Sequence, residues 1–188
     1  MNWDRVHDGR TTFLACMHAM CSPGTPIELP QVPQVSEYPE LDGAAAILLA
    51  LLDHGLLLGV SGAAAARRVA EMAVRETGAV TGDVGCADWV LVHGPAADAI
   101  SRAHRGSRRT PEKGATIVIA AAGEALPLSM VGPGIAERAT AFVPLESVAV
   151  HAFTAANANP PSGVDLLVVT PECLIGIPRS VSVHHGVG

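Results

Sequence analysis

The sequence predicts an α/β fold in which helices cover a mixed β-sheet. Apolar runs of strand length alternate with segments of helical periodicity, which is the pattern of a layered α/β domain. Near the C-terminus, the apolar runs Leu166–Val169 and Leu174–Ile177 flank Thr170-Pro171-Glu172 and predict an antiparallel hairpin. A chain of 188 residues suits one domain, which buries roughly 70% of its unfolded surface. We therefore expect a single α/β domain over residues 1–188.

The first predicted element is a helix over Thr11–Met20. Phe13, Met17 and Met20–Cys21 recur at helical spacing and form one apolar stripe, as on a helix that packs against a core. Ser22-Pro23-Gly24 ends this helix, because proline cannot continue the hydrogen bonding and glycine accepts a left-handed turn.

The next segment combines a short strand, a loop, a helix and a second strand. Thr25–Leu29 predicts the short strand, and residues 30–41, rich in Pro, Gln and Glu, predict a surface loop. Asp42 is a good N-cap for a helix over Gly43–Asp53. The apolar run Leu56–Val60 then predicts a buried strand.

The middle of the chain repeats the alternation of helices and strands. Ser61 is the predicted cap of a helix over Ala63–Glu76, with Gly78 just past its end, and Trp89–Val92 predicts a strand. The late hairpins add antiparallel pairs to the one mixed sheet that we expect. The remaining predicted elements are a helix from Pro95 to about His104, a basic loop over Arg102–Arg109, strands over Thr116–Ala122 and Leu126–Val131, and a helix over Pro144–Asn157.

The composition limits the classes of partner. Twelve Lys and Arg against 18 Asp and Glu give a formal charge of −6, which argues against a nucleic-acid surface, and 3% aromatic residues leave few platforms for base stacking.

The longest apolar runs, Ala44–Leu52 and Leu56–Val60, are shorter than the ~18 residues of a membrane span. The first ten residues lack the apolar core of a secretory signal, so we expect a cytoplasmic chain with four reduced cysteines. The apolar excess then belongs to a core and in part to a protein interface.

Two glycine-rich segments resemble anion-binding loops. Gly132-Pro133-Gly134-Ile135-Ala136-Glu137 begins like a dinucleotide fingerprint, but Glu137 replaces the third glycine and Pro133 lacks a backbone donor. A structural turn at Gly132 and Gly134 is the favoured interpretation, with a nucleotide site as the alternative. Gly59–Gly62 precedes a predicted helix, where an ordinary helix start is favoured over an anion site.

Two groups of soft side chains suggest a metal at first glance. On a helix, Cys16 and His18 lie about 200° apart, with Cys21 between them at about 140°, so the three do not converge. Cysteines packed in the core and an exposed His18 are the favoured interpretation. His184-His185 near the C-terminus offers two further ligands, but a frayed terminus is favoured there. The sequence therefore predicts no metal site.

Asp165 and Arg179 are the charged residues that most invite a role. Asp165 opens a buried strand, and Arg179 follows Pro178 at the end of the returning strand. They either pair across the hairpin as structural charges or present a polar edge to a partner, and the sequence leaves both alternatives open.

Four blocks together resemble a known family, the PhnH family of the bacterial carbon–phosphorus lyase system. The resemblance covers about residues 13–183 and depends on the order and spacing of the blocks. The blocks are FLACMHAMCSPG (Phe13–Gly24), GATIVIAAAG (Gly114–Gly123), VGPGIAER (Val131–Arg138) and PPSGVDLLVVTPECLIGIPRS (Pro160–Ser180).

The resemblance implies a fold, a function and partners. The implied fold is a three-layer α/β/α domain like the large domain of pyridoxal-phosphate-dependent transferases. The implied function is that of a non-catalytic or co-catalytic subunit of the core complex that converts ATP and an alkylphosphonate to α-D-ribose 1-alkylphosphonate 5-triphosphate with release of adenine, and no catalytic residue is assigned to this chain. A homodimer and contacts with the other proteins of the core are implied as well. Asp165, Arg179, Gly132 and Gly134 are the candidate interface or binding residues. The alternative is a stand-alone small-molecule transferase or anion-binding protein that reuses the fold.

The implied fold raises the question of pyridoxal phosphate, which needs a lysine for its Schiff base. The sequence has one lysine, Lys113, in the polar segment Thr110–Gly114. Such a segment predicts an exposed loop and not a desolvated pocket. We therefore expect no cofactor.

Overall fold

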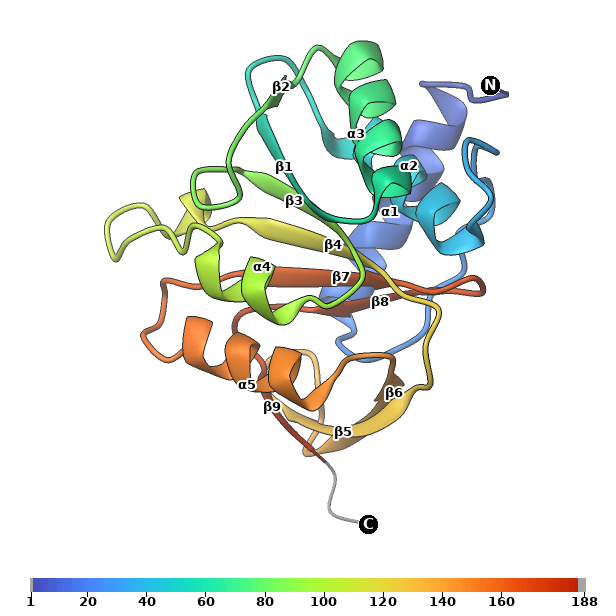
Figure 1. The fold of residues 1–188 in the computed structure, drawn as a ribbon. Helices are drawn as coiled ribbons and strands as arrows, with labels where there is room; N and C mark the ends of the chain where they lie inside the picture. The colour runs from blue at the N-terminus through green and yellow to red at the C-terminus, as the bar shows by residue number, and fades with distance from the viewer. Residues whose placement is uncertain (1, 186–188) are drawn as a thin grey trace.

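A six-stranded sheet forms the centre of the molecule in the computed structural model, which describes residues 2–185 (Figure 1). The strand order is β2-β1-β3-β4-β7-β8, with all neighbours parallel except β7 and β8. The predicted mixed sheet and the predicted C-terminal hairpin are therefore confirmed. Its strands are β1 (Leu57–Gly62), β2 (Val80–Thr81), β3 (Trp89–His93), β4 (Thr116–Ala120), β7 (Asp165–Val169) and β8 (Leu174–Ile177).

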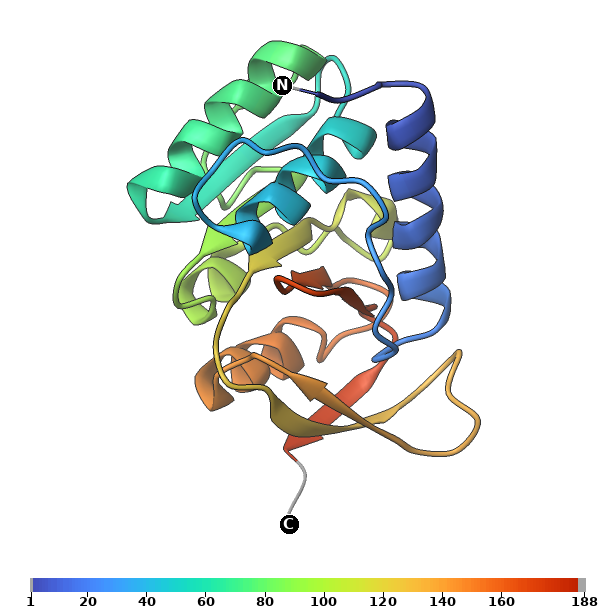
Figure 2. The same ribbon diagram turned by 90° about the vertical axis from the view of Figure 1, so that its right-hand side faces the viewer.

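Helices lie on both faces of this sheet (Figures 1 and 2). Successive residues of a strand point to opposite faces, so Val90 and Val92 of β3 join the core beneath α4 and α5, whereas Leu91 joins the core beneath α1, α2 and α3. Burial on both faces explains why these strands are continuous apolar runs in the sequence. The helices are α1 (His7–Cys21), α2 (Pro39–Leu51), α3 (Ala64–Thr77), α4 (Ala97–Arg102), α5 (Ser147–Ala156) and the 3₁₀ turn η1 (Pro111–Lys113).

A second, antiparallel sheet of three strands lies beyond β8 at the C-terminal end of the molecule (Figure 1). It consists of β6 (Ala139–Val143), β5 (Leu126–Val131) and β9 (Ser182–His185), in that order. The expectation of a single sheet is therefore wrong, since β4 and β5 belong to different sheets. The expectation of a frayed His184-His185 is also wrong, because Ser129 of β5 pairs with His184. Backbone pairing with β5 orders this segment.

The predicted apolar stripe of the first helix is mostly on its exposed side. The side chains that α1 buries are small, and Phe13 and Met17 are each 45% exposed. The physical reason is a close approach to β8, where a Cβ on Gly176 would collide with the backbone of Ala19. Close packing of backbones selects the face with small residues over the face with large ones. The buried residues of α1 are Gly9, Thr12, Ala15, Cys16 and Ala19.

Two predicted helix caps are wrong as well. The second helix begins at Pro39, so Asp42 lies inside it, and its Oδ1 accepts the backbone N–H groups of Val35 (3.0 Å) and Ser36 (2.8 Å). Asp42 therefore holds the preceding loop on α2. Ser61 lies within β1 and makes no cap, whereas Gly78 ends α3 in a left-handed conformation (φ 78°), as predicted.

The bounds of the other helices and strands lie within a few residues of the predicted bounds. Three strands were not predicted from the sequence. Thr25–Leu29 forms one isolated bridge, between Ile27 and Leu174, in place of a strand. No helix within residues 2–185 has the length and apolar character needed to cross a membrane. The unpredicted strands are β2, β6 and β9.

Candidate functional site

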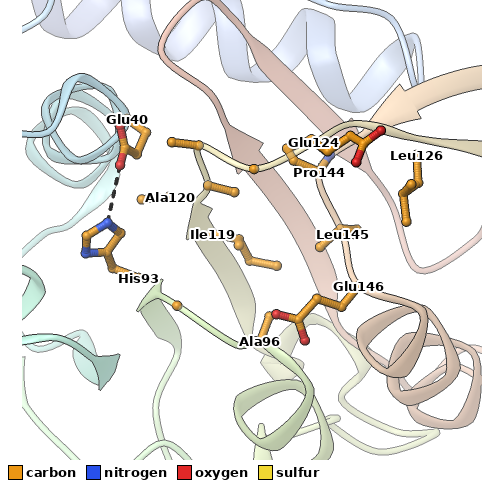
Figure 3. Close-up of a pocket in the computed structure, with 14 residues that line it drawn as sticks. Glu40, His93, Ala96, Ile119, Ala120, Glu124, Leu126, Pro144, Leu145 and Glu146 are labelled. Atoms are coloured by element: carbon orange, nitrogen blue, oxygen red, sulfur yellow. Dashed lines mark hydrogen bonds and ion pairs between the residues drawn. The ribbon is translucent and has the colours of Figure 1, made fainter.

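The main candidate site is a pocket of about 350 Å³ at the carboxyl ends of β3 and β4 (Figure 3). The chain passes from β1 outward to β2 and then returns to β3 on the other side of β1. In open α/β sheets, ligands bind outside the carboxyl ends of the strands at such a reversal of direction. The pocket shares the carboxyl end of the sheet with this reversal but lies one strand along from it, and no residue of β1 lines it. Its lining residues come from α2, the ends of β3 and β4, the loop before β5 and the start of α5.

His93 and Glu40 make the central polar contact of this pocket. The Nε2 atom of His93 lies 3.3 Å from Oε1 of Glu40, and their side chains are 17% and 4% exposed. Glu40 lies in the first turn of α2, where the positive end of the helix dipole stabilises a carboxylate. The ring of Tyr38 packs on His93 with centroids 4.9 Å apart. The pair links the start of α2 to the end of β3.

The position of His93 depends on close packing at the end of β1. Gly62 has a φ of 110°, and a Cβ at this position would collide with the carbonyl of His93. That carbonyl accepts the N–H of Ala63 at 3.3 Å. Because a side chain fits neither the dihedral nor the space, glycine is required here. Gly62 therefore serves packing against β3, whereas a Cβ on Gly59 would approach Val84 and Ala87.

The hydrogen bond to Glu40 fixes the chemistry of the imidazole. The nitrogen that faces Glu40 is Nε2, and a hydrogen bond to a carboxylate requires this nitrogen to be the donor. Nδ1 is buried and has no hydrogen-bond partner among the described residues. A general base has to present its lone pair to a reactant. In this arrangement, His93 therefore acts as a structural donor.

Carboxylates dominate the electrostatics of the pocket. Glu40 lies inside it, and the exposed residues Glu124 and Glu146 stand on its rim, on the loop before β5 and at the start of α5 (Figure 3). The one basic group that lines it is His93. Like charges that face each other across a partly buried space repel strongly. The pocket therefore favours hydrogen-bond donors or cations over phosphate or phosphonate groups.

Asp165 and Arg179 lie at the opposite end of the sheet and pair with each other. The backbone N–H and Nε of Arg179 donate to Asp165 at 2.7 and 3.0 Å, and Nη2 donates to Asp165 as well. The guanidinium also donates to the carbonyls of Pro111 (2.6 Å) and Gly114 (3.2 Å). Both side chains are less than one fifth exposed. This geometry favours the structural alternative, because Asp165 of β7 and the carbonyls of Pro111 and Gly114 already use the donors of Arg179.

Gly132 and Gly134 form the turn between β5 and β6. Gly134 has a φ of 84°, and a Cβ there would lie 2.6 Å from the carbonyl oxygen of Cys21. A Cβ on Gly132 would lie 2.9 Å from the carbonyl oxygen of Ser180. The backbone of α1 and of the β8–β9 connection therefore occupies the space that a nucleotide would need. The geometry favours the structural turn.

The remaining candidates lie apart from the pocket. Lys113 is exposed in η1, as predicted. Burial raises the pKa of the Cys16 thiol to about 12, whereas Cys21 is exposed, so the expectation that both cysteines are in the core is wrong for Cys21. His18 is exposed, as predicted. Within residues 2–185, no three His, Cys, Asp or Glu side chains are grouped as metal ligands.

Sequence reasoning misses both members of the His93–Glu40 pair. A weak signal is present for each, since His93 follows a buried apolar run and precedes Gly94-Pro95, and Glu40 follows Pro39 at a helix start. The two residues are distant in the sequence, and neither signal predicts the other. Strand order brings them together, and the local patterns do not predict strand order.

Comparison with known proteins identifies the family. A search of curated proteins finds no match. A family model described as bacterial phosphonate metabolism protein (PhnH) matches residues 2–184. This range includes nearly all of both sheets, all the helices of the described chain and the His93–Glu40 pocket. The chain therefore belongs to the PhnH family of bacterial phosphonate metabolism proteins.

Proposed function

We propose that this chain is a subunit of the carbon–phosphorus lyase core complex. In this role, it supports formation of α-D-ribose 1-alkylphosphonate 5-triphosphate from ATP and an alkylphosphonate, with release of adenine. The observation that carries the proposal is the family match over residues 2–184, nearly the whole chain. The proposed location is the cytoplasm, where ATP is available.

The chemistry of the pocket supports a role without independent turnover. ATP and alkylphosphonates both carry phosphorus oxyanions, and the pocket presents Glu40, Glu124 and Glu146 to them. The formal charge of the chain, −6, adds long-range repulsion. Nε2 of His93 is engaged by Glu40, and its Nδ1 is buried away from the pocket surface. Catalysis in the assembly is therefore proposed to depend on residues of the other core proteins.

The proposed fold relationship is to the large domain of pyridoxal-phosphate-dependent transferases, as a three-layer domain without the cofactor. Helices on both faces of a mostly parallel sheet support this relationship. Lys113 is exposed in a 3₁₀ turn, which is unsuitable for a desolvated Schiff base. Addition of pyridoxal phosphate should give no more imine absorbance with the wild-type chain than with Lys113→Ala. A lysine-dependent absorbance band with tight binding would contradict this part of the proposal.

The proposed oligomer is a homodimer. The large apolar side chains on the outer face of α1 support it, since Phe13, Leu14 and Met17 are exposed beside a hollow of about 250 Å³. Sedimentation at micromolar concentration should show a dimer. A monomer at every concentration would contradict the homodimer.

Copurification is the experiment that tests membership in the complex. The chain, tagged at its N-terminus, should copurify with the co-expressed core proteins in fixed stoichiometry. The same tagged chain should bind neither ATP nor methylphosphonate in calorimetry when it is alone. Failure to copurify, together with tight binding of either compound, would instead support a stand-alone transferase or anion-binding protein.

A further inference from the structure

Strand β6 is an unprotected edge of the small sheet. It pairs with β5 on one side, and within residues 2–185 no strand pairs with its other side. The third strand of this sheet, β9, lies on the far side of β5. An unpaired edge presents backbone N–H and C=O groups that another strand can join.

Both edge strands of the large sheet are less able than β6 to pair with another chain. At one edge, β2 has two residues, which is too short to template a partner strand. At the other edge, β8 is covered by the bridge between Ile27 and Leu174 and by α1, which packs on Gly176. Strand β6 has five residues, Ala-Thr-Ala-Phe-Val, without the charge, proline or bulge that usually blocks edge pairing.

A side-chain pocket lies beside this edge. Phe142 is 64% exposed and lines a groove of about 360 Å³ together with Pro26, Pro171 and Ile175. The opposite residue on β5 is Pro127, which adds apolar surface next to Phe142. Backbone pairing provides affinity in strand addition, and pockets for alternate side chains provide specificity. Both components are present at β6.

The charges around the groove define the occupant. Glu124 lies between two residues that line the groove, Glu172 lines it directly, and Glu137 precedes β6 by two positions. All three side chains are exposed. Arg138 directly precedes β6 and donates to Ser129 Oγ at 3.0 Å, but the three carboxylates outnumber it, so charge complementarity favours an occupant with basic residues.

A second copy of this chain would bring the same acidic surroundings to β6, since Glu124, Glu137 and Glu172 are exposed near this edge. Like charges brought together across an interface are unfavourable. A chain with basic residues is therefore the better partner for this edge.

We infer that β6 is a docking edge for an extended, basic segment of another protein of the core complex. The segment adds a fourth strand to the small sheet beside β6 and places an apolar side chain in the groove next to Phe142. Its Lys or Arg residues lie against Glu124, Glu137 and Glu172. This inference rests on the proposed membership in the core complex, and it names the surface of this chain that contacts another core protein.

Hydrogen exchange on the copurified complex tests the backbone part of the inference. Outward-facing amides within residues 139–143 should exchange more slowly in the complex than in the isolated chain, because they donate to the added strand. Val80, on edge strand β2 of the large sheet, provides the control region. Unchanged exchange at 139–143 in a complex that does form would overturn the inference and leave the proposed function standing.

Two matched variants test the side-chain part. Phe142→Asp should weaken capture of the core proteins by about tenfold or more, as expected for an apolar anchor at the centre of an interface. Val80→Asp introduces the same charge on edge strand β2, where Val80 is 50% exposed, and should leave capture unchanged. Both variants should keep the circular-dichroism spectrum and thermal midpoint of the wild type. Equal capture by Phe142→Asp and the wild type would contradict the inference, whereas no capture by the wild type would contradict the proposed function.

The salt dependence of capture tests the proposed charge pairs. Glu124→Gln and Glu172→Gln together should weaken capture and reduce its dependence on salt, because fewer charge pairs form with the basic segment. A double variant that binds more tightly would show that the partner segment is acidic, which would contradict the inference.

Discussion

The charged side chains at the two ends of the large sheet are arranged differently. At the amino end of β7, Arg179 spreads its donors over Asp165 and the carbonyls of Pro111 and Gly114. At the carboxyl end of β3, Glu40 pairs with His93 and faces a pocket with two more carboxylates on its rim. The first end is a closed network that joins three segments, and the second is open. The comparison indicates that the amino end stabilises the fold and that the carboxyl end is available for binding.

The largest expected effect on stability comes from removing Arg179 from its hydrogen-bond network. Arg179→Ala leaves the largely buried carboxylate of Asp165 without its partner and should lower the free energy of unfolding by about 3 kcal/mol. Urea denaturation measures this loss. Arg102→Ala is the matched control, since its pairs with Asp83 and Asp98 are exposed and screened by solvent, and it should lower the free energy of unfolding far less. A stable Arg179→Ala chain that fails to join the complex would instead support the partner-facing alternative.

A smaller effect is expected at the packed end of β1. Gly62→Ala forces a side chain into a left-handed backbone conformation and against the carbonyl of His93. We expect a loss of about 1–3 kcal/mol in the free energy of unfolding, measured in the same way. Gly55→Ala is the control for the dihedral alone, because Gly55 has a φ of 87° and open space around its Cβ position. Equal losses in the two variants would show that contact with His93 contributes nothing.

The His93–Glu40 pair should have a comparable or smaller effect on stability. His93→Ala removes the partner of a buried carboxylate and should cost about 1–3 kcal/mol. His93→Asn keeps a donor and should recover part of the loss. A full loss of assembly activity in a stable His93→Asn chain would contradict the structural role of this histidine.

The smallest effect is expected at the start of α1. Oδ1 of Asp4 accepts the N–H groups of Val6 (2.8 Å) and His7 (3.0 Å), and the hydrogen bonds from His7 and Val6 lower the pKa of Asp4 to about 2. The side-chain bond to Asp4 raises the pKa of His7. The contribution of Asp4 is therefore present above its ordinary value of 3.8 and is lost as the pH falls through about 2. The contribution of His7 is present below its ordinary value of 6.5 and is lost as the pH rises through its raised pKa.

An NMR titration of the two side chains checks these directions. Asp4→Asn should return the His7 midpoint toward its ordinary value and speed amide exchange in the first turn of α1. A His7 midpoint that is the same in both chains would contradict the contact between these residues.

The sequence predicts best where local chemistry decides the structure. The hairpin of β7 and β8 is predictable because Thr170-Pro171-Glu172 lies between two buried apolar runs, and Gly78 ends α3 by its own conformational freedom. The predictions fail where a distant backbone decides. The buried face of α1 is set by Gly176 of β8, and β9 is ordered by β5.

The candidate site shows the same division. Asp165 and Arg179 stand out in the sequence because they flank one hairpin, and the structure joins them. Glu40 and His93 meet because α2 starts near the end of β3, which follows from strand order and not from local pattern. The acidic character of the pocket depends on Glu124 and Glu146 as well, which come from two further segments. No short stretch of the sequence contains this information.

Adenine release by a reconstituted complex tests the central claim most directly. The other purified core proteins are mixed with ATP and methylphosphonate, with and without this chain, and adenine is quantified by chromatography. The account predicts phosphonate-dependent adenine release when the chain is present, little release when it is omitted, and none from the chain alone. Full release without the chain, or release by the chain alone, would contradict the subunit role.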